Sequence, residues 1–218
     1  LFPYTTLFRS MTATSGTPLF NVTVEWEYTI VPSGSVRRFV CTSDRDEYRE
    51  LLLDIPATSP WLMKPRPGMN AASKESYELL ELTVDGRPQS IRRTARKTGQ
   101  TYSVQLDTAA RSGEPVRIRQ IFRVVTPEWG HRLYFQLPQP ARGFSLRIDY
   151  TNTAIVELTV TDNLATSRTA QITRSPDSIT GKTASINVAG WLLPKSGFSA
   201  TWTLDAELPR DKQRREVA

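Results

Sequence analysis

The sequence has very few of the residues from which disulfides and metal sites are built. Its 218 residues include one cysteine, Cys41, and one histidine, His131. One thiol cannot form an internal disulfide or a thiolate metal cluster, and one imidazole excludes a site made of several histidines. We therefore expect no cofactor and no metal, and a single cysteine fits a reduced, cytoplasmic setting best.

Long apolar runs are also absent. No stretch approaches the roughly eighteen consecutive apolar residues that a membrane-spanning helix needs. The segment TATSGTPLFN, which follows Met11, has neither the basic start nor the apolar stretch of a signal peptide. We therefore expect no membrane partner.

Catalytic motifs are missing or incomplete. No G-x-S-x-G nucleophile elbow occurs. Residues 180–183, TGKT, imitate the end of a phosphate-binding loop, but Pro176 stands where that motif needs a glycine. The acidic residues near strand ends, such as Glu128, Asp149 and Asp162, are typical of turns and surfaces. The sequence thus predicts a protein that is not an enzyme.

The first ten residues, LFPYTTLFRS, match the one-frame translation of a widely used short-read sequencing adapter, CTC TTT CCC TAC ACG ACG CTC TTC CGA TCT. We therefore expect residues 1–10 to be an artefact and the native chain to begin at or before Met11. Because adapters join DNA at arbitrary break points, we expect the chain to belong to a larger bacterial protein truncated at its N-terminus.

The strongest structural signal is the alternation of apolar and polar residues. In residues 20–30 six apolar side chains occupy every second position, which predicts an antiparallel strand with one face on a core. Residues 36–42 follow a Pro-Ser-Gly-Ser turn and are expected to pair as a returning strand with residues 20–30. Asp85-Gly86 predicts a second hairpin, between residues 80–84 and 90–97. Further strands are expected at residues 102–106, 116–124, 133–137, 144–150, 154–161, 168–173, 184–188 and 198–204. This spacing predicts a mostly β fold, an antiparallel β-sandwich or barrel-like layers.

One packed α-helix is expected near residues 44–55. Ser43 is the expected N-cap, and acidic residues follow in the first turn. An apolar stripe with helical spacing should lie on the sheet: Tyr48, Leu51, Leu52 and Ile55. Residues 56–72 contain four prolines and are expected to be irregular, with residues 60–63 covering a sheet edge or lining a groove.

The turn at residues 126–130 is the best candidate for a domain boundary. It separates a β-rich subdomain with one helix, residues 19–125, from a second sandwich-like subdomain, residues 126–208. Residues 11–18 are expected to be flexible, and residues 209–218 to form a disordered charged tail.

Arginines form the first candidate binding feature in a chain whose net charge is +6. If two predicted strands are neighbours, they would form a basic face: Arg92, Arg93 and Arg96 on one, Arg117, Arg119 and Arg123 on the other. Such a face could hold a phosphate backbone or an acidic partner. The alternative, which the sequence favours, is cross-strand pairing with Glu25, Glu27 or Glu81.

Tryptophans form the second candidate feature. Trp61, Trp129 and Trp191 all stand beside proline or glycine in expected loops. Exposed tryptophans can stack on sugars or anchor a protein interface. The alternative is that each plugs an end of the core, because tryptophan is highly buried on average.

Together these features favour a non-enzymatic recognition or interaction domain of β-sandwich type, the sensory or partner-binding part of a larger protein. A protein is the expected partner. Two alternatives stay open: a nucleic-acid-binding module that uses the arginine face, and a carbohydrate-binding module that uses the loop tryptophans.

Overall fold

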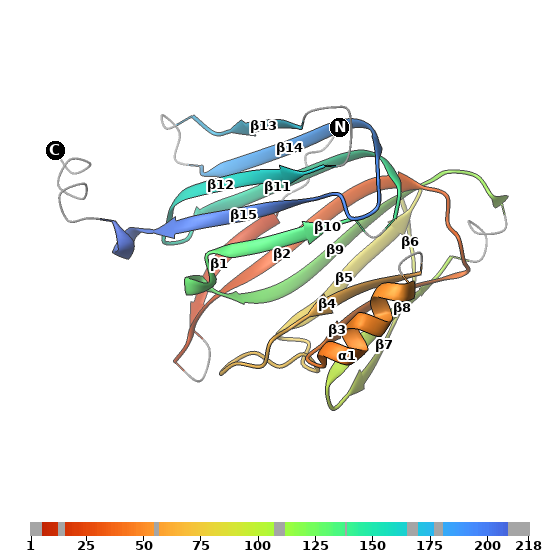
Figure 1. The fold of residues 1–218 in the computed structure, drawn as a ribbon, viewed down its shortest axis with the longest axis horizontal. Coiled ribbons are helices and arrows are strands. Elements are labelled where there is room, and N and C mark those ends of the chain that lie inside the picture. Colours follow the sequence, from red (N-terminus) through yellow and green to blue (C-terminus); the bar gives the residue numbers. More distant parts are fainter. Residues whose placement is uncertain are drawn as a thin grey trace.

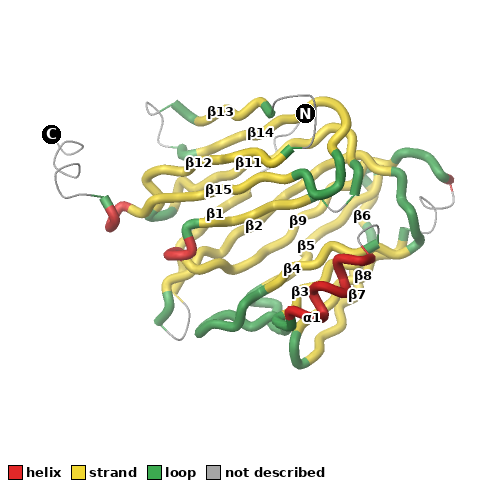
Figure 2. The backbone as a smooth tube through the Cα atoms, viewed as in Figure 1, coloured by secondary structure: helices red, strands yellow, loops and turns green. Residues whose placement is uncertain are grey.

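The computed structural model describes residues 6–12, 16–54, 57–106, 112–137, 139–164, 170–176 and 181–208. These residues form three β-sheets, none of which closes into a barrel (Figure 1). Strand dominates the described chain, and the α-helix is a short element at one edge (Figure 2). The expectation of a mostly β, sandwich-like fold with one helix is confirmed.

The largest sheet has eight strands and forms one complete layer. In spatial order they are β13 (Gln171–Arg174), β14 (Thr183–Leu192), β11 (Ala141–Asn152), β1 (Thr6–Thr12), β2 (Pro18–Ile30), β9 (Val116–Pro127), β5 (Tyr77–Val84) and β6 (Arg87–Pro88). All neighbouring pairs are antiparallel except β1 with β11. β2 also pairs directly with β11, near Tyr28 and Phe144.

Two smaller sheets share the second layer (Figure 1). One has the order β10 (Arg132–Gln136), β15 (Gly197–Leu204), β12 (Ile155–Asn163), and the other β4 (Thr58–Leu62), β3 (Val36–Thr42), β8 (Gly99–Gln105), β7 (Ile91–Arg96). The remaining elements are α1 (Arg45–Leu51) and three short 3-10 turns, η1 (Leu52–Asp54), η2 (Glu128–Gly130) and η3 (Asp205–Glu207). The seven-residue α1 is too short to cross a membrane, and no other described helix could do so.

Aromatic side chains hold the two layers together. Trp26 of β2 makes edge-to-face contacts with Phe122 and Phe144 of the large sheet and with Phe135 of β10, at 5.9, 6.0 and 5.9 Å between ring centroids. Since these rings meet, they lie on one face of the large sheet, and Tyr77 of β5 joins them at 6.0 Å from Phe122. Tyr77 also lies 6.1 Å from Tyr102 of β8, between ring centroids, so both smaller sheets cover the same face.

Several strands pair with other partners than expected. Residues 36–42 form β3, but β3 pairs with β8 and β4 and not with β2. The Asp85-Gly86 hairpin exists, with φ of 48° and 78°, but only the two-residue β6 returns from it. Residues 91–96 form β7, which pairs with β8. These expectations were wrong because alternation specifies which face of a strand is buried and not which strand lies beside it.

The helix lies where it was expected, but its cap and its packing differ. Asp44, not Ser43, is the N-cap: its carboxylate accepts from the backbone N–H of Asp46 at 2.8 Å and of Glu47 at 3.2 Å. The Ser43 hydroxyl instead donates to the Thr98 carbonyl at 2.9 Å. No residue of α1 is buried, so the predicted apolar stripe does not enter the core. Of that stripe, Ile55 lies outside the described residues.

Several expected segments and the expected domain boundary can be compared with the strands of the structure. Residues 58–62, expected to be irregular, form the edge strand β4. Thr6–Thr12, which includes part of the adapter-like segment, forms β1, and β2 begins at Pro18. The large sheet and the apolar core take residues from both sides of the expected boundary at residues 126–130. The charged tail at residues 209–218 lies outside the described residues.

Candidate functional site

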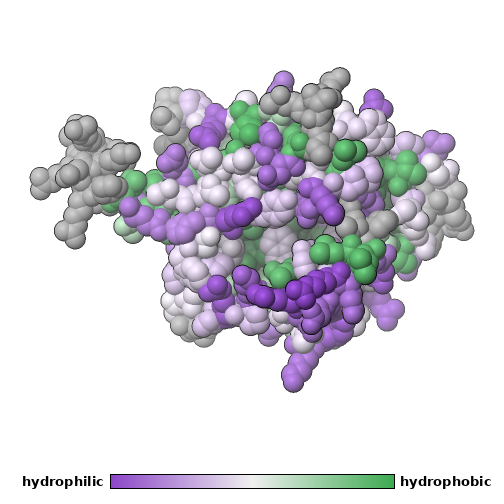
Figure 3. All heavy atoms as spheres, viewed as in Figure 1, coloured by the Kyte–Doolittle hydropathy of each residue, from purple (hydrophilic) through white to green (hydrophobic). Residues whose placement is uncertain are grey.

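A cleft of about 720 Å³ opens where the three sheets meet. Its floor is the large sheet, and its two sides are β10 and β4, the facing edge strands of the smaller sheets. Tyr48 and Leu52 of the helical segment extend the β4 side. Figure 3 shows this face hollowed near its centre, with strongly hydrophilic side chains along the lower margin.

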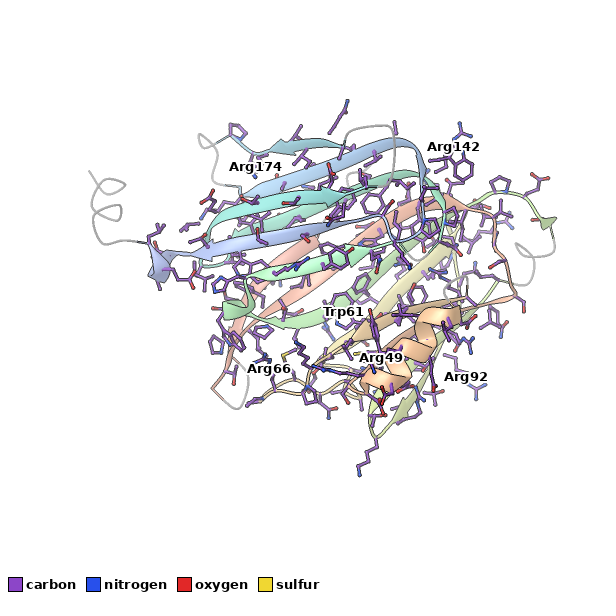
Figure 4. All side chains as sticks on the ribbon, in the orientation of Figure 1. Arg49, Trp61, Arg66, Arg92, Arg142 and Arg174 are labelled. Atoms are coloured by element: carbon purple, nitrogen blue, oxygen red, sulfur yellow. The ribbon has the colours of Figure 1, made fainter. Side chains whose placement is uncertain are left out.

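The floor and inner walls of the cleft are aromatic. Trp61 of β4, labelled in Figure 4, lies 6.1 Å from Phe122 and 6.2 Å from Tyr77 of the large sheet, between ring centroids. Trp26 lines the cleft as well, and its indole Nε1 is buried without a hydrogen-bond partner. A buried donor without an acceptor is costly to the fold.

The rim is basic. It carries Lys64, Arg66, Arg132 and Lys195, and no Asp, Glu, His or Cys is among the described residues that line the cleft. The Arg66 guanidinium lies 4.3 Å from the centroid of the Trp129 ring, and that of Arg132 lies 5.5 Å from the Tyr134 ring and donates to the Ser199 hydroxyl at 3.1 Å. These contacts hold both cations in place without neutralising their charge.

Two phenols face each other across the cleft. Tyr48 comes from α1. Tyr134 comes from β10, and this residue is 37% exposed. Burial raises the pKa of the Tyr48 phenol above its ordinary value, and the Tyr134 phenol adds to the rise. Tyr48 therefore stays neutral at physiological pH and offers a hydroxyl rather than an anion to an occupant.

The structure brings together two of the three predicted tryptophans. Trp61 and Trp129 both line the cleft, Trp129 at 46% exposure, so neither is simply a plug of the core. Trp191 lies on β14, opposite Arg142 of β11, is 61% exposed and does not line the cleft. The groove predicted at residues 60–63 is therefore present.

The predicted arginines do not form one sheet face. Arg92, Arg93 and Arg96 lie on β7 of the four-stranded sheet, whereas Arg117, Arg119 and Arg123 lie on β9 of the large sheet. The cross-strand pairing that the sequence favoured is confirmed for β9: its ion pairs are Arg117 with Glu27, Arg119 with Glu25 and Glu81, and Arg123 with Glu78. On β7, Arg96 pairs with Glu47, and Arg93 donates to the Gln100 side chain and the Ala72 carbonyl.

The single cysteine and histidine do not meet. Cys41 is buried in β3, and burial raises the pKa of its thiol to about 12. His131 contacts the Trp202 carbonyl through Nδ1 at 3.1 Å and the Glu207 carboxylate through Nε2 at 3.1 Å. The thiol is therefore a protonated core group at physiological pH.

Sequence reasoning missed most of the basic rim. Lys64 and Arg66 precede and follow Pro65 in a turn, and Lys195 stands alone in the turn before β15. Only Arg132 and Tyr134 carried a signal, because both occupy outward positions of an alternating strand. Nothing in the sequence shows that these turns meet at one cleft.

Comparison with known proteins identifies no family. No family model matches the chain, and no curated protein matches it. Among solved structures, the chain is similar to the M1 zinc metallopeptidase from Deinococcus radiodurans at 13% identity and a TM-score of 0.42. The similar region covers 91% of this chain and 41% of that enzyme.

Proposed function

We propose that the protein is a non-enzymatic recognition domain that binds a segment of a protein partner in the cleft between β10 and β4. The observation that carries this proposal is the lining of the cleft: aromatic rings below and four cations above, with no carboxylate among the described lining residues. Tryptophan, tyrosine and arginine are the residues that contribute most to protein interfaces. A cleft of this size accepts several side chains of an extended segment.

The other two candidate partners have less support. The arginines expected to hold nucleic acid are mostly paired with glutamates, which removes much of the attraction for phosphate. The tryptophans expected to stack on sugars are split between the cleft and β14. The described residues therefore present neither a broad basic face for nucleic acid nor a single aromatic platform for a sugar.

The setting of the domain belongs to the same proposal. We place it in the cytoplasm, because a lone protonated thiol in the core requires no oxidising compartment.

The test is selection from a displayed library of random peptides about twelve residues long, on the full chain. Fluorescein-labelled copies of the selected peptides are then titrated and followed by anisotropy. We expect Trp129→Ala to weaken binding at least tenfold, because it removes an exposed ring of the cleft wall. Trp191→Ala, which removes an exposed ring outside the cleft, is the matched control and should change nothing.

Two results would contradict the proposal. One is peptide binding that Trp129→Ala leaves unchanged, which would place the peptides elsewhere. The other is tighter binding of an oligothymidylate or of maltohexaose than of any selected peptide, with the same loss in Trp129→Ala.

A further inference from the structure

One side of the cleft is an open strand edge. β10 is the last strand of its sheet, with β15 on one side and no described strand on the other. Such an edge presents a row of backbone N–H and C=O groups that another strand can pair with. Only every second residue of β10 can point its N–H and C=O groups toward the cleft.

The hydrogen bonds at both ends of β10 show which residues bond to β15. The Leu137 N–H donates to the Ser196 carbonyl at 2.8 Å, and the Trp202 N–H donates to the His131 carbonyl at 3.2 Å. Paired residues alternate along an antiparallel ladder, so the odd positions 131 to 137 bond to β15. The N–H and C=O groups of the even positions therefore face the cleft: Arg132, Tyr134 and Gln136.

The opposite side of the cleft is not an equivalent edge. β4 bonds to β3 through odd positions, since Met63 N–H donates to the Thr42 carbonyl and Arg38 N–H donates to the Ala57 carbonyl. The same alternation turns Pro60 toward the cleft, and proline has no N–H. Proline at an edge prevents strand addition there. β10 is the edge that remains open.

Charge indicates the composition of the strand that would add. No carboxylate of the described residues forms an ion pair with Lys64, Arg66, Arg132 or Lys195. The arginines of β9, by contrast, each have a glutamate partner. Figure 4 shows Arg66 on the cleft margin, on the same face as Trp61. The rim thus complements an acidic segment, and the floor complements apolar side chains.

We propose that the partner contributes an extended acidic segment that joins β10 as an added strand, an inference that rests on the proposed function. Its backbone pairs with Arg132, Tyr134 and Gln136. Alternate apolar side chains point down onto Trp26, Trp61 and Phe122, and carboxylates reach the basic rim. The added strand extends the second layer across the cleft floor, as in other cases of recognition by β-augmentation.

The decisive test compares Tyr134→Pro with Tyr134→Ala, using the tightest labelled peptide from the library selection. Both variants lose the Tyr134 ring, but only the proline variant loses the N–H that faces the cleft. That N–H is not used by β15, so the proline leaves the β10–β15 ladder intact. We expect the proline variant to bind at least tenfold more weakly than the alanine variant.

A second pair, Gln136→Pro against Gln136→Ala, repeats the comparison at the next cleft-facing position. It keeps the proposal testable if Tyr134→Pro does not fold, which far-ultraviolet circular dichroism will show. Equal affinities within both pairs would overturn strand addition. If Trp129→Ala still abolished binding in that case, the proposed function would stand, and the peptide would bind through its side chains alone.

Charge is tested separately. We expect the selected peptides to be enriched in Asp and Glu, and Arg66→Gln and Arg132→Gln each to weaken their binding about fivefold and to reduce its salt dependence. Arg49→Gln is the control, because Arg49 already pairs with Asp46 on the outer side of α1. Selected peptides without acidic enrichment, bound equally by the Arg66 and Arg132 variants, would refute the acidic segment.

Discussion

Phe135→Ala is the sharpest test of the orientation of β10, on which the cleft and its open edge depend. Phe135 is 1% exposed, and its ring lies 5.9 Å from that of Trp26, so it links the second layer to the large sheet. Removing a buried phenylalanine side chain costs about 3–5 kcal/mol, since transfer and cavity terms add. The lost edge-to-face pair places this site in the upper half of that range. We expect a loss of about 4 kcal/mol in the free energy of unfolding.

Urea titration followed by tryptophan fluorescence measures this loss, with Tyr134→Ala as the control. Tyr134 is the next residue and points outward at 37% exposure, so its truncation should cost less than about 1 kcal/mol. A Phe135→Leu variant should fall between the two. If Tyr134→Ala destabilises the protein more than Phe135→Ala, the alternation of β10 is reversed, and the assignment of its cleft-facing N–H groups fails with it.

Three further predictions concern the sheet and the core. Arg119→Met should lower the free energy of unfolding by about 1–2 kcal/mol in urea titrations, because it leaves the mostly buried Glu25 without this partner. Arg49→Met, at an exposed ion pair, is the control and should cost almost nothing. Equal losses in the two variants would contradict this prediction. Burial raises the pKa of Cys41 from 9.0 to about 12, so above pH 9 the unfolded chain loses a proton that the native chain keeps, and stability falls by up to about 1.4 kcal/mol per pH unit. Cys41→Val should remove that part of the alkaline decline, and an unchanged pH profile would argue against the raised pKa. Deletion of residues 1–10 should leave a folded chain in which the β11 amides beside β1 exchange hydrogen faster, and a wholly unfolded product would show that the adapter-like segment is essential to the fold.

The sequence allowed the elements to be predicted far better than their partners. Alternation over residues 20–30 identified β2 and its inward face, since Trp26 and its alternating neighbours are buried. It could not show that β3 pairs with β8, because partner choice depends on contacts distant in sequence. The helix cap was missed by one residue, since Ser43 and Asp44 are both good caps and a tertiary hydrogen bond to Thr98 occupies Ser43.

The candidate site illustrates the same limit more strongly. The sequence indicated Trp61 and Trp129 as candidate binding residues. Their shared cleft exists because the second layer is divided between two sheets whose edges do not pair. The cations of the rim come from three separate turns and strands, so no spacing in the sequence marks them. Of the arginines that stood out as a pattern, the three on β9 are paired with glutamates, because alternation on a wet sheet face places opposite charges side by side.

The cations of the large sheet and those of the cleft differ in their partners among the described residues. On the outer face of the large sheet, Arg119 and its neighbours have glutamates across the strand, and the structure itself satisfies their charge. At the cleft, Arg66 lies on an indole ring and Arg132 beside a phenol and a hydroxyl, which orient the guanidinium groups without providing a counter-charge. An edge strand without proline and cations without a carboxylate partner among the described residues meet at one cleft. Each lacks the group that an extended acidic segment would bring, and no single small anion would supply both.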